Sequence, residues 1–163
     1  VSGEIVLQGG LVMKEYFNMP EETKATIVNG WLRTGDLGII DDRGYVFIKD
    51  RIRDVIITGG FNVYPSDIEA VLGQHPGIKE CVVFGVGDKK WGEAVHAAVE
   101  LHKNVADTEE DLIRFIKNKL DSVKAPKKIH ITNSLPRSPV GKVLRREAKA
   151  YFSVLTTLTN KKI

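Results

Sequence analysis

Cysteine is almost absent from the sequence, and this excludes an internal disulfide. The 163 residues contain one cysteine, Cys81, and a single thiol fits a reducing compartment, so we expect a cytoplasmic protein. Cys81 lies in an apolar run with Val82, Val83 and Phe84. Free cysteine is among the most frequently buried residue types, so we interpret Cys81 as a small core residue and not as a nucleophile.

Long apolar runs and a strong excess of one charge are absent as well. No segment approaches the ~20 apolar residues of a membrane-spanning helix and no signal peptide is recognisable, so we expect no transmembrane segment. The 24 basic and 21 acidic residues leave a formal charge of +3, which is too small to indicate nucleic-acid binding by itself. The four histidines lack the spacing of metal ligands, so we expect no metal site on the protein.

The residues that are present describe a globular chain. Hydrophobic residues make up 42% and charged residues 28%, a mixture that excludes a disordered or a membrane protein. The chain does not begin with Met, and Gly3-Glu4 leads directly into a strand-like run, so we interpret it as cut inside a domain. Basic residues gather towards the carboxyl end, where they form either a solvated surface or a phosphate site. These residues are Lys124, Lys127, Lys128, Arg137, Lys142, Arg145, Arg146 and Lys149.

The first fifty residues have mainly β character. Alternating apolar residues predict a strand over residues 4–8, and Pro20 with two following glutamates marks the start of a short helix. Residues 30–36 are expected to form a loop. Residues 37–40 and 45–49 are expected to form a hairpin, because the Asp-Asp-Arg-Gly sequence between them tolerates the backbone angles of a turn.

A different pattern follows residue 54. Its order is strand, helix, strand, strand, helix, strand, helix, which predicts an α+β fold with helices packed on a small mixed β-sheet. Expected strands cover 55–58, 78–86, 94–101 and 128–132, and expected helices begin at Pro65, follow a capping box over residues 107–110 and cover 143–152. Residues 153–163 show no clear period. The charged run over residues 50–54 separates the two patterns and suits a hinge.

The loop over residues 135–142 carries the most informative candidate. Two prolines restrict its backbone, Gly141 frees its tip, and Lys142 stands just before a helix. A lysine held in this way can reach a phosphate or carboxylate oxygen as a point charge. The loop is not a Walker motif, because the upstream glycines are absent and Val143 replaces the Ser or Thr. Taken alone, Lys142 is more readily interpreted as a solvated lysine at the start of a helix.

Two further segments are candidates for binding. Asp36 follows Gly35 and could accept hydrogen bonds from a ribose diol, although an ordinary turn aspartate is the alternative. Gly59 and Gly60 interrupt an apolar strand, and glycines allow a ligand to approach the backbone closely.

Together, the order and spacing of these segments resemble the adenylate-forming superfamily, which includes acyl-CoA synthetases, adenylation domains of peptide synthetases and luciferases. The resemblance runs from about Gly3 to Phe152. Residues 59–65, Gly-Gly-Phe-Asn-Val-Tyr-Pro, are more similar to acyl-CoA synthetases than to peptide synthetases. The matching pieces are Gly3-Glu4, residues 12–16, 30–36, 50–65 and Glu69, residues 85–88 and 91–94, Pro136-Arg137 and Gly141-Lys142.

The resemblance implies a domain organisation for the chain. Residues 1–50 would end the large AMP-binding domain, residues 51–54 would be the hinge, residues 55–152 would form the carboxyl-terminal lid domain, and residues 153–163 would be a tail. The phosphate loop, the acyl pocket and the adenine-binding motif of the family have no counterpart in this sequence. The missing amino-terminal domain would carry them, so we expect the fragment alone to be inactive.

The resemblance also implies a reaction. ATP with Mg²⁺ and a carboxylic acid would first form an acyl-adenylate and pyrophosphate, and the thiol of the co-substrate CoA would then form a thioester. Lys142 matches the catalytic lysine that stabilises charge during adenylation. Asp36 matches the ribose-binding aspartate, and Arg51 matches an arginine that contacts the nucleotide.

Three other residues match positions that serve the rotation of the lid domain. Arg53 falls at the hinge position, where relatives often carry Asp or Lys, and Gly59 and Gly60 would line the CoA channel after rotation. Asp50 and Gly87 depart from the common Gly and Pro of the family. Two alternatives remain open: a peptide-synthetase adenylation domain that loads a carrier-protein thiol, and a non-enzymatic binding module.

Overall fold

The computed structural model describes residues 2–160, and the side chains of residues 157–160 lie outside that description. The chain divides into two compact units, Val1–Arg53 and Asp54–Ile163. The division falls within the charged run over residues 50–54.

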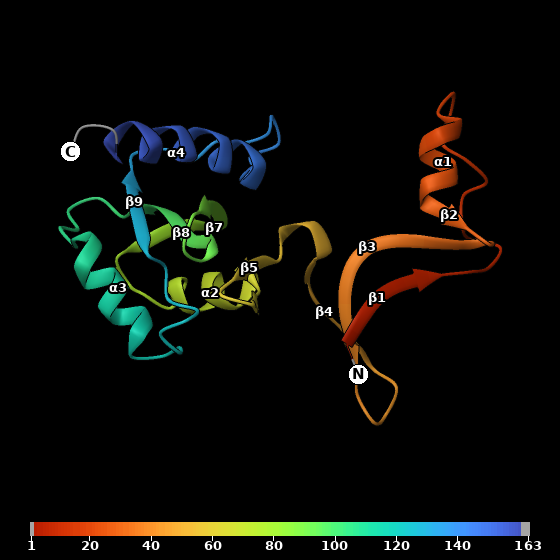
Figure 1. Ribbon diagram of the computed structural model, residues 1–163, viewed down its shortest axis with the longest axis horizontal. Helices are drawn as coiled ribbons and strands as arrows, with labels where there is room; N and C mark the ends of the chain where they lie inside the picture. The colour runs from red at the N-terminus through yellow and green to blue at the C-terminus, as the bar shows by residue number, and fades with distance from the viewer. Residues whose placement is uncertain (1, 161–163) are drawn as a thin grey trace. The chain divides into compact units, whose positions relative to one another are not determined.

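The first unit is an antiparallel sheet built around one long strand (Figure 1). The central strand β3 pairs with each of the other three strands. The elements are β1 (Ser2–Leu7), α1 (Pro20–Thr26), β2 (Ile27–Val28), β3 (Trp31–Ile40) and β4 (Val46–Arg51). The predicted strand near the amino end, the helix at Pro20 and the hairpin are confirmed.

The expected loop over residues 30–36 is wrong, because residues 31–36 form the first part of β3. Polar contacts to β1 stabilise this segment: Thr34 Oγ1 donates to the carbonyl of Ile5 over 2.6 Å, and Arg33 donates to Glu4. Its polar sequence has no apolar alternation, and Gly35 adopts a φ of +71° within the strand. The strand is therefore specified by its partner and not by a local pattern.

The second unit contains a five-stranded mixed sheet. Its elements are η1 (Ile52–Asp54, at the boundary), β5 (Ile56–Thr58), β6 (Phe61–Val63), α2 (Pro65–Leu72), β7 (Ile78–Asp88), β8 (Gly92–Leu101), α3 (Glu109–Lys117), β9 (Lys128–Thr132) and α4 (Arg145–Asn160). Strands β7 and β8 are antiparallel over almost their whole length, whereas β8 and β9 are parallel. The predicted α+β fold with a small mixed sheet is confirmed.

Alternation along β7 and β8 divides the core between the two faces of this sheet. Val83, Val95 and Val99 pack with residues of α2 and α3, and Phe84 and Ala98 pack on the other face with α4. Figure 1 shows α4 on one side of the sheet and α2 and α3 on the other. Such a two-sided sheet explains the continuous apolar runs in both strands, since successive side chains of a strand point to opposite faces.

Cys81 packs against the α2–α3 side of the core, as predicted. Burial, together with nearby Glu69 and Glu80, raises the pKa of its thiol to about 12. The thiol is therefore protonated at neutral pH, which is consistent with a packing role.

One helix end and one strand differ clearly from expectation in the second unit. Helix α4 begins at Arg145 and continues to Asn160, past the expected end at Phe152. Many residues after position 152 are β-branched or polar and are weak helix formers, so no helical period is visible there. Strand β6 was not expected, because it is only three residues long. It pairs with β5 across the turn at Gly59 and Gly60.

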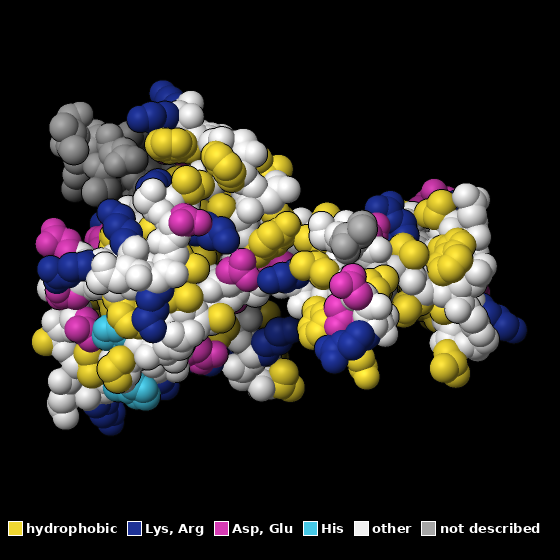
Figure 2. Space-filling model, turned by 90° about the horizontal axis from the view of Figure 1, so that it is seen from below, with side chains coloured by type: hydrophobic (Ala, Val, Ile, Leu, Met, Phe, Trp, Pro, Cys, Tyr) yellow, Lys and Arg dark blue, Asp and Glu magenta, His cyan; other side chains and the backbone are white. Residues whose placement is uncertain are grey.

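Apolar side chains are exposed on the first unit. Val46, Phe47 and Ile48 are three successive residues of β4, and all are exposed. Since successive residues of a strand face opposite sides, both faces of this sheet are open at β4. Figure 2 shows apolar side chains at the surface of this unit, in the right-hand part of the view. Within residues 2–160, none of the helices has both the length and the apolar composition of a membrane-spanning segment.

Candidate active site

Lys142 lies at the end of a tight hairpin between β9 and α4. The Ser138 N–H donates to the carbonyl of Lys142 over 2.8 Å, and the Gly141 N–H donates to the carbonyl of Ser138 over 2.8 Å. The Lys142 N–H donates to Ser138 Oγ over 3.2 Å. Gly141 has a φ of +85°, which few other residues adopt. The Lys142 side chain is exposed and makes no hydrogen bond or ion pair with the described residues.

The base of this hairpin is closed by residues on both arms. Arg137 and Val143 form an isolated antiparallel bridge, and the Leu144 N–H donates to the carbonyl of Pro136 over 2.9 Å. The Lys142 backbone is therefore held in place, while its ammonium is free to reach outward.

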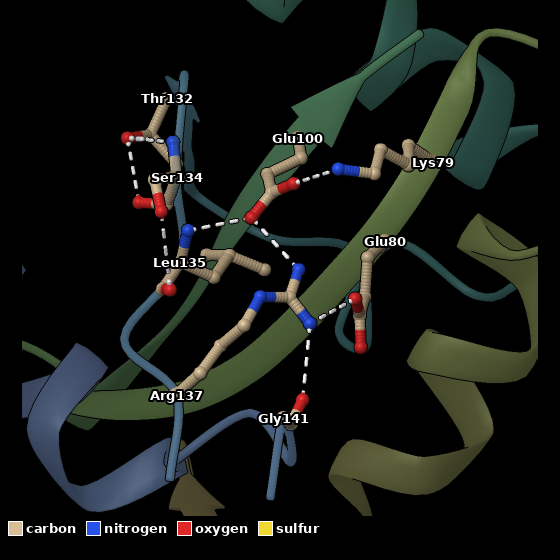
Figure 3. Close-up of polar contacts among 8 residues, drawn as sticks. All are labelled: Lys79, Glu80, Glu100, Thr132, Ser134, Leu135, Arg137 and Gly141. Carbon is tan, nitrogen blue, oxygen red and sulfur yellow. Dashed lines mark hydrogen bonds and ion pairs between the residues drawn. The ribbon is translucent and has the colours of Figure 1, made fainter. Parts of the chain in front are cut away.

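Arg137 connects the hairpin to the sheet (Figure 3). Its Nη1 atom lies 2.6 Å from Glu80 Oε2 and donates to the carbonyl of Gly141 over 3.3 Å. Its Nη2 atom donates to Glu100 Oε1 over 2.9 Å. One guanidinium therefore joins β7, β8 and the residue before Lys142.

Glu100 is a buried carboxylate, with 3% of its surface exposed. It accepts hydrogen bonds from the Leu135 N–H at 2.6 Å, from Lys79 Nζ at 2.9 Å and from Arg137. Burial acts to raise its pKa, but the hydrogen bonds from Leu135, Lys79 and Arg137 lower it to about 2. Glu100 is therefore ionised at neutral pH, as an anchor for cations must be.

Asp36 and Arg51 form an ion pair in the first unit. They face each other across β3 and β4, and Arg51 Nε lies 2.8 Å from Asp36 Oδ1. About half of the Arg51 side chain and a quarter of the Asp36 side chain are exposed, so a ligand can reach both. Glu4 supports this segment, since its Oε1 accepts from the Gly35 N–H over 3.2 Å.

Gly59 and Gly60 form the turn between β5 and β6. Gly59 has a φ of +57°, and a Cβ at this position would lie 3.1 Å from the ring of Trp91. The Gly59 N–H donates to the carbonyl of Trp91 over 2.8 Å. Gly59 is therefore fixed against the indole, whereas a Cβ at Gly60 would meet no atom within 4 Å.

Arg53 lies in η1, next to the boundary between the two units. The following residue, Asp54, accepts from Arg145 Nη1 over 2.7 Å. Arg145 Nη2 also donates to both carboxylate oxygens of Glu69, at 2.8 and 2.9 Å. The first residue of the second unit is thereby attached to the start of α4 and to α2.

The structure brings some of the predicted residues together. Asp36 pairs with Arg51, and Gly59 adjoins Gly60, while Lys142 belongs to a separate hairpin of the second unit. Glu100 and its contact to Arg137 were not predicted from the sequence. A signal existed, because Glu100 is the one acidic residue inside the apolar run over residues 94–101. No cluster of metal-ligating side chains occurs among the described residues.

The chain is similar to known proteins over most of its length. Residues 67–142 match the family described as the AMP-binding enzyme C-terminal domain. The long-chain-fatty-acid–CoA ligase FadD13 of Mycobacterium tuberculosis is 43% identical over 151 residues, which cover 93% of this chain and 30% of FadD13. The fatty acid–[acyl-carrier-protein] ligase ScoC of Streptomyces coeruleorubidus is 46% identical over 150 residues, which cover 92% of this chain and 29% of ScoC.

A solved structure gives the same result for the fold. The crystal structure of ATP-bound MatB from Rhodopseudomonas palustris matches with a TM-score of 0.88 and 38% identity, over 95% of this chain and 31% of that one. The chain thus spans about 30% of the length of the relatives it matches. The resemblance noted in the sequence is confirmed, and the chain belongs to the adenylate-forming superfamily of AMP-binding enzymes.

Proposed function

We propose that this chain is the carboxyl-terminal portion of an ATP-dependent acyl-CoA synthetase. The enzyme would convert a carboxylate and ATP to an acyl-adenylate and pyrophosphate, and then transfer the acyl group to the thiol of CoA with release of AMP. The names of the relatives support this reaction class. The open β4 surface of the first unit supports its origin in a larger AMP-binding domain. A cytoplasmic location stays a prediction that rests on the single cysteine.

One observation carries the catalytic part of the proposal: Lys142 presents an exposed ammonium from a hairpin whose backbone is fixed. During adenylation a carboxylate oxygen attacks the α-phosphorus of ATP, and the bond to pyrophosphate breaks. Negative charge then gathers on the oxygens around the phosphorus. A cation already in position stabilises that charge more than it stabilises the substrates, and this lowers the barrier.

Asp36 and Arg51 are proposed to hold the nucleotide. A carboxylate can accept both hydroxyl groups of a ribose, and a guanidinium suits phosphate or ribose oxygens. Both side chains are accessible, which fits this use. No residue of this chain is proposed as a ligand for Mg²⁺, which would arrive with ATP.

The second half-reaction is proposed to use the hinge. Residues 51–54, with Arg53 at the pivot, would let the lid domain over residues 55–152 rotate between adenylation and thioester formation. Gly59 and Gly60 would then line the channel for the pantetheine arm of CoA. A side chain at position 59 would be too close to Trp91. This supports a role in which the turn must stay free of side chains.

The proposal is tested by incubating the full-length enzyme with ATP, Mg²⁺, CoA and a panel of fatty and aryl acids. We expect an acyl-CoA, AMP and pyrophosphate as products. Formation of ADP and phosphate, or no thioester from any acid of the panel, would contradict the reaction class.

A carrier-protein thiol is a second candidate for the acceptor, because ScoC is named as a ligase for acyl-carrier protein. The same assay decides between the two acceptors when CoA is replaced by a phosphopantetheinylated carrier protein. Faster acyl transfer to CoA supports the synthetase, and faster transfer to the carrier protein supports the alternative.

A further inference from the structure

We propose that Arg137, held between Glu80 and Glu100, is a positioning residue that fixes the direction in which Lys142 leaves its hairpin. This inference rests on the adenylation role proposed for Lys142. Arg137 does not contact the substrates and acts only through the backbone of the hairpin.

The tip of the hairpin has no packing of its own. Val140 is 90% exposed, and a Cβ at Gly141 would meet no atom within 4 Å. Apolar burial therefore fixes the base of the hairpin, where Leu135 is buried and Val143 packs on the core, but it does not fix the tip. Since a lysine has a long flexible stem, the position of Lys142 also depends on polar contacts in the hairpin.

Ser138 contacts the backbone of Lys142 directly, and Arg137 supplies the contact that ties the neighbouring Gly141 to the sheet. Its Nη1 atom donates to the carbonyl of Gly141, which is part of the peptide bond to Lys142. The same guanidinium is held by Glu80 at 2.6 Å and by Glu100 at 2.9 Å (Figure 3). A guanidinium keeps its donors in a planar fork, so two fixed carboxylates also fix the donor aimed at Gly141.

The two carboxylates need a cation at this place. Glu80 and Glu100 are direct partners on the antiparallel strands β7 and β8, and like charges in such a pair repel. Arg137 lies between them and contacts both. Glu100 is further fixed by the Leu135 N–H and by Lys79, so it is a rigid attachment point even without Arg137.

Lys79 provides a matched control for this role. It donates to the same carboxylate as Arg137, over 2.9 Å, but it lies on β7 and makes no described contact with the hairpin. Removing Lys79 weakens the Glu100 network without releasing Gly141. Removing Arg137 weakens the same network and also removes the hydrogen bond to the Gly141 carbonyl.

The test compares Arg137→Gln, Arg137→Lys and Lys79→Gln in the full-length enzyme, each with and without Lys142→Ala. We expect Arg137→Gln to lower kcat for adenylation about 10- to 100-fold, since small misplacements of a catalytic group have effects of this size. We expect its KM values, and thioester formation from supplied acyl-adenylate, to stay near native. Arg137→Lys should lower kcat for adenylation less than Arg137→Gln does, and Lys79→Gln should keep a nearly native kcat.

The double variants separate positioning from a general structural role. If Arg137 acts through Lys142, adding Arg137→Gln to Lys142→Ala causes no further loss of adenylation. The inference is overturned if Arg137→Gln lowers kcat for adenylation by the same factor in the Lys142→Ala background as in the native enzyme. It is also overturned if Lys79→Gln lowers kcat for adenylation as much as Arg137→Gln does. If Arg137→Gln fails to fold, as judged by circular dichroism, Arg137→Lys with and without Lys142→Ala provides the same test. Native adenylation by Lys142→Ala alone would refute the proposed function of Lys142 instead.

Discussion

Arg51 Nε lies 2.8 Å from Asp36 Oδ1, and the two residues face each other across the neighbouring strands β3 and β4. Arg51 also donates to the carbonyl of Thr34 over 3.4 Å. The two residues proposed to contact the nucleotide are therefore already side by side, with part of each side chain open to solvent.

Removing the Asp36 carboxylate should weaken nucleotide binding. We expect Asp36→Ala in the full-length enzyme to raise the KM for ATP about 10-fold or more, because hydrogen bonds to a charged group are lost. The KM for the carboxylic acid should change little. Asp42→Ala is the control, since Asp42 lies in the exposed turn after β3. An unchanged KM for ATP in Asp36→Ala would argue against the ribose contact.

A methyl group at Gly59 should disturb the turn between β5 and β6. The added Cβ would lie 3.1 Å from the Trp91 ring at a φ of +57°, and we expect a loss of about 1–2 kcal/mol in folding stability. If this turn lines the CoA channel, thioester formation should fall more than adenylation. Gly60→Ala is the comparison, because its φ is also positive but its Cβ would meet open space. Losses confined to adenylation would contradict the channel assignment.

The second unit should lose stability in mild acid through the buried His96, which contacts the partly exposed His130. His96 Nδ1 lies 3.2 Å from His130 Nε2. Burial, and then the charges of His130 and Lys128, lower the pKa of His96 to about 4, against smaller opposing effects of Glu109 and Asp88. The unfolded chain therefore binds more protons than the folded chain between about pH 6.5 and about pH 4. Stability should fall as the pH falls through this window, and His96 alone contributes at most about 1.4 kcal/mol per pH unit to this fall.

Urea unfolding of the 163-residue chain, followed by circular dichroism from about pH 7 to about pH 4, measures this dependence. His96→Gln cannot take up the proton, so its stability should fall less steeply over the same range. If the free energy of unfolding depends on pH equally steeply in the native chain and in His96→Gln, the role of His96 is contradicted.

Arg145 should matter for stability at the boundary of the second unit. It joins Asp54 to Glu69 through hydrogen bonds of 2.7 to 2.9 Å, and its side chain is only 25% exposed. We expect Arg145→Met to cost about 3 kcal/mol in urea unfolding, because it leaves two partly buried carboxylates without their cation. The exposed neighbour Arg146 is the control, and Arg146→Met should cost little. Similar losses in both variants would show that the bridge contributes nothing specific.

Local signals in the sequence predicted the elements that depend on local contacts. The turn over residues 41–45 forms as expected, with Asp41 Oδ1 accepting from the N–H groups of Arg43 and Tyr45. The capping box expected over residues 107–110 forms one residue later, between Thr108 and Asp111. In both cases the deciding contacts lie within four residues of the chain, so a short motif contains the information.

Contacts between distant residues could not be predicted in the same way. The first part of β3 is held by contacts to Glu4 and Ile5, 29 residues earlier. Arg137 meets Glu100 across 37 residues, and no periodicity encodes such a pair. The motif order identified Lys142, Asp36 and Arg51 as candidates, but only the structure supplied the contacts that hold the Lys142 hairpin.

The proposed role of Lys142 is in adenylation and not in thioester formation. It is tested most directly by measuring both half-reactions of full-length Lys142→Ala: ATP–pyrophosphate exchange with the acid, and thioester formation from supplied acyl-adenylate and CoA. The exposed Lys103→Ala serves as the matched control. We expect Lys142→Ala to lose about 100- to 1,000-fold in the exchange reaction and to form the thioester at a near-native rate. Equal losses in the two half-reactions, or an exchange rate equal to that of Lys103→Ala, would contradict the account.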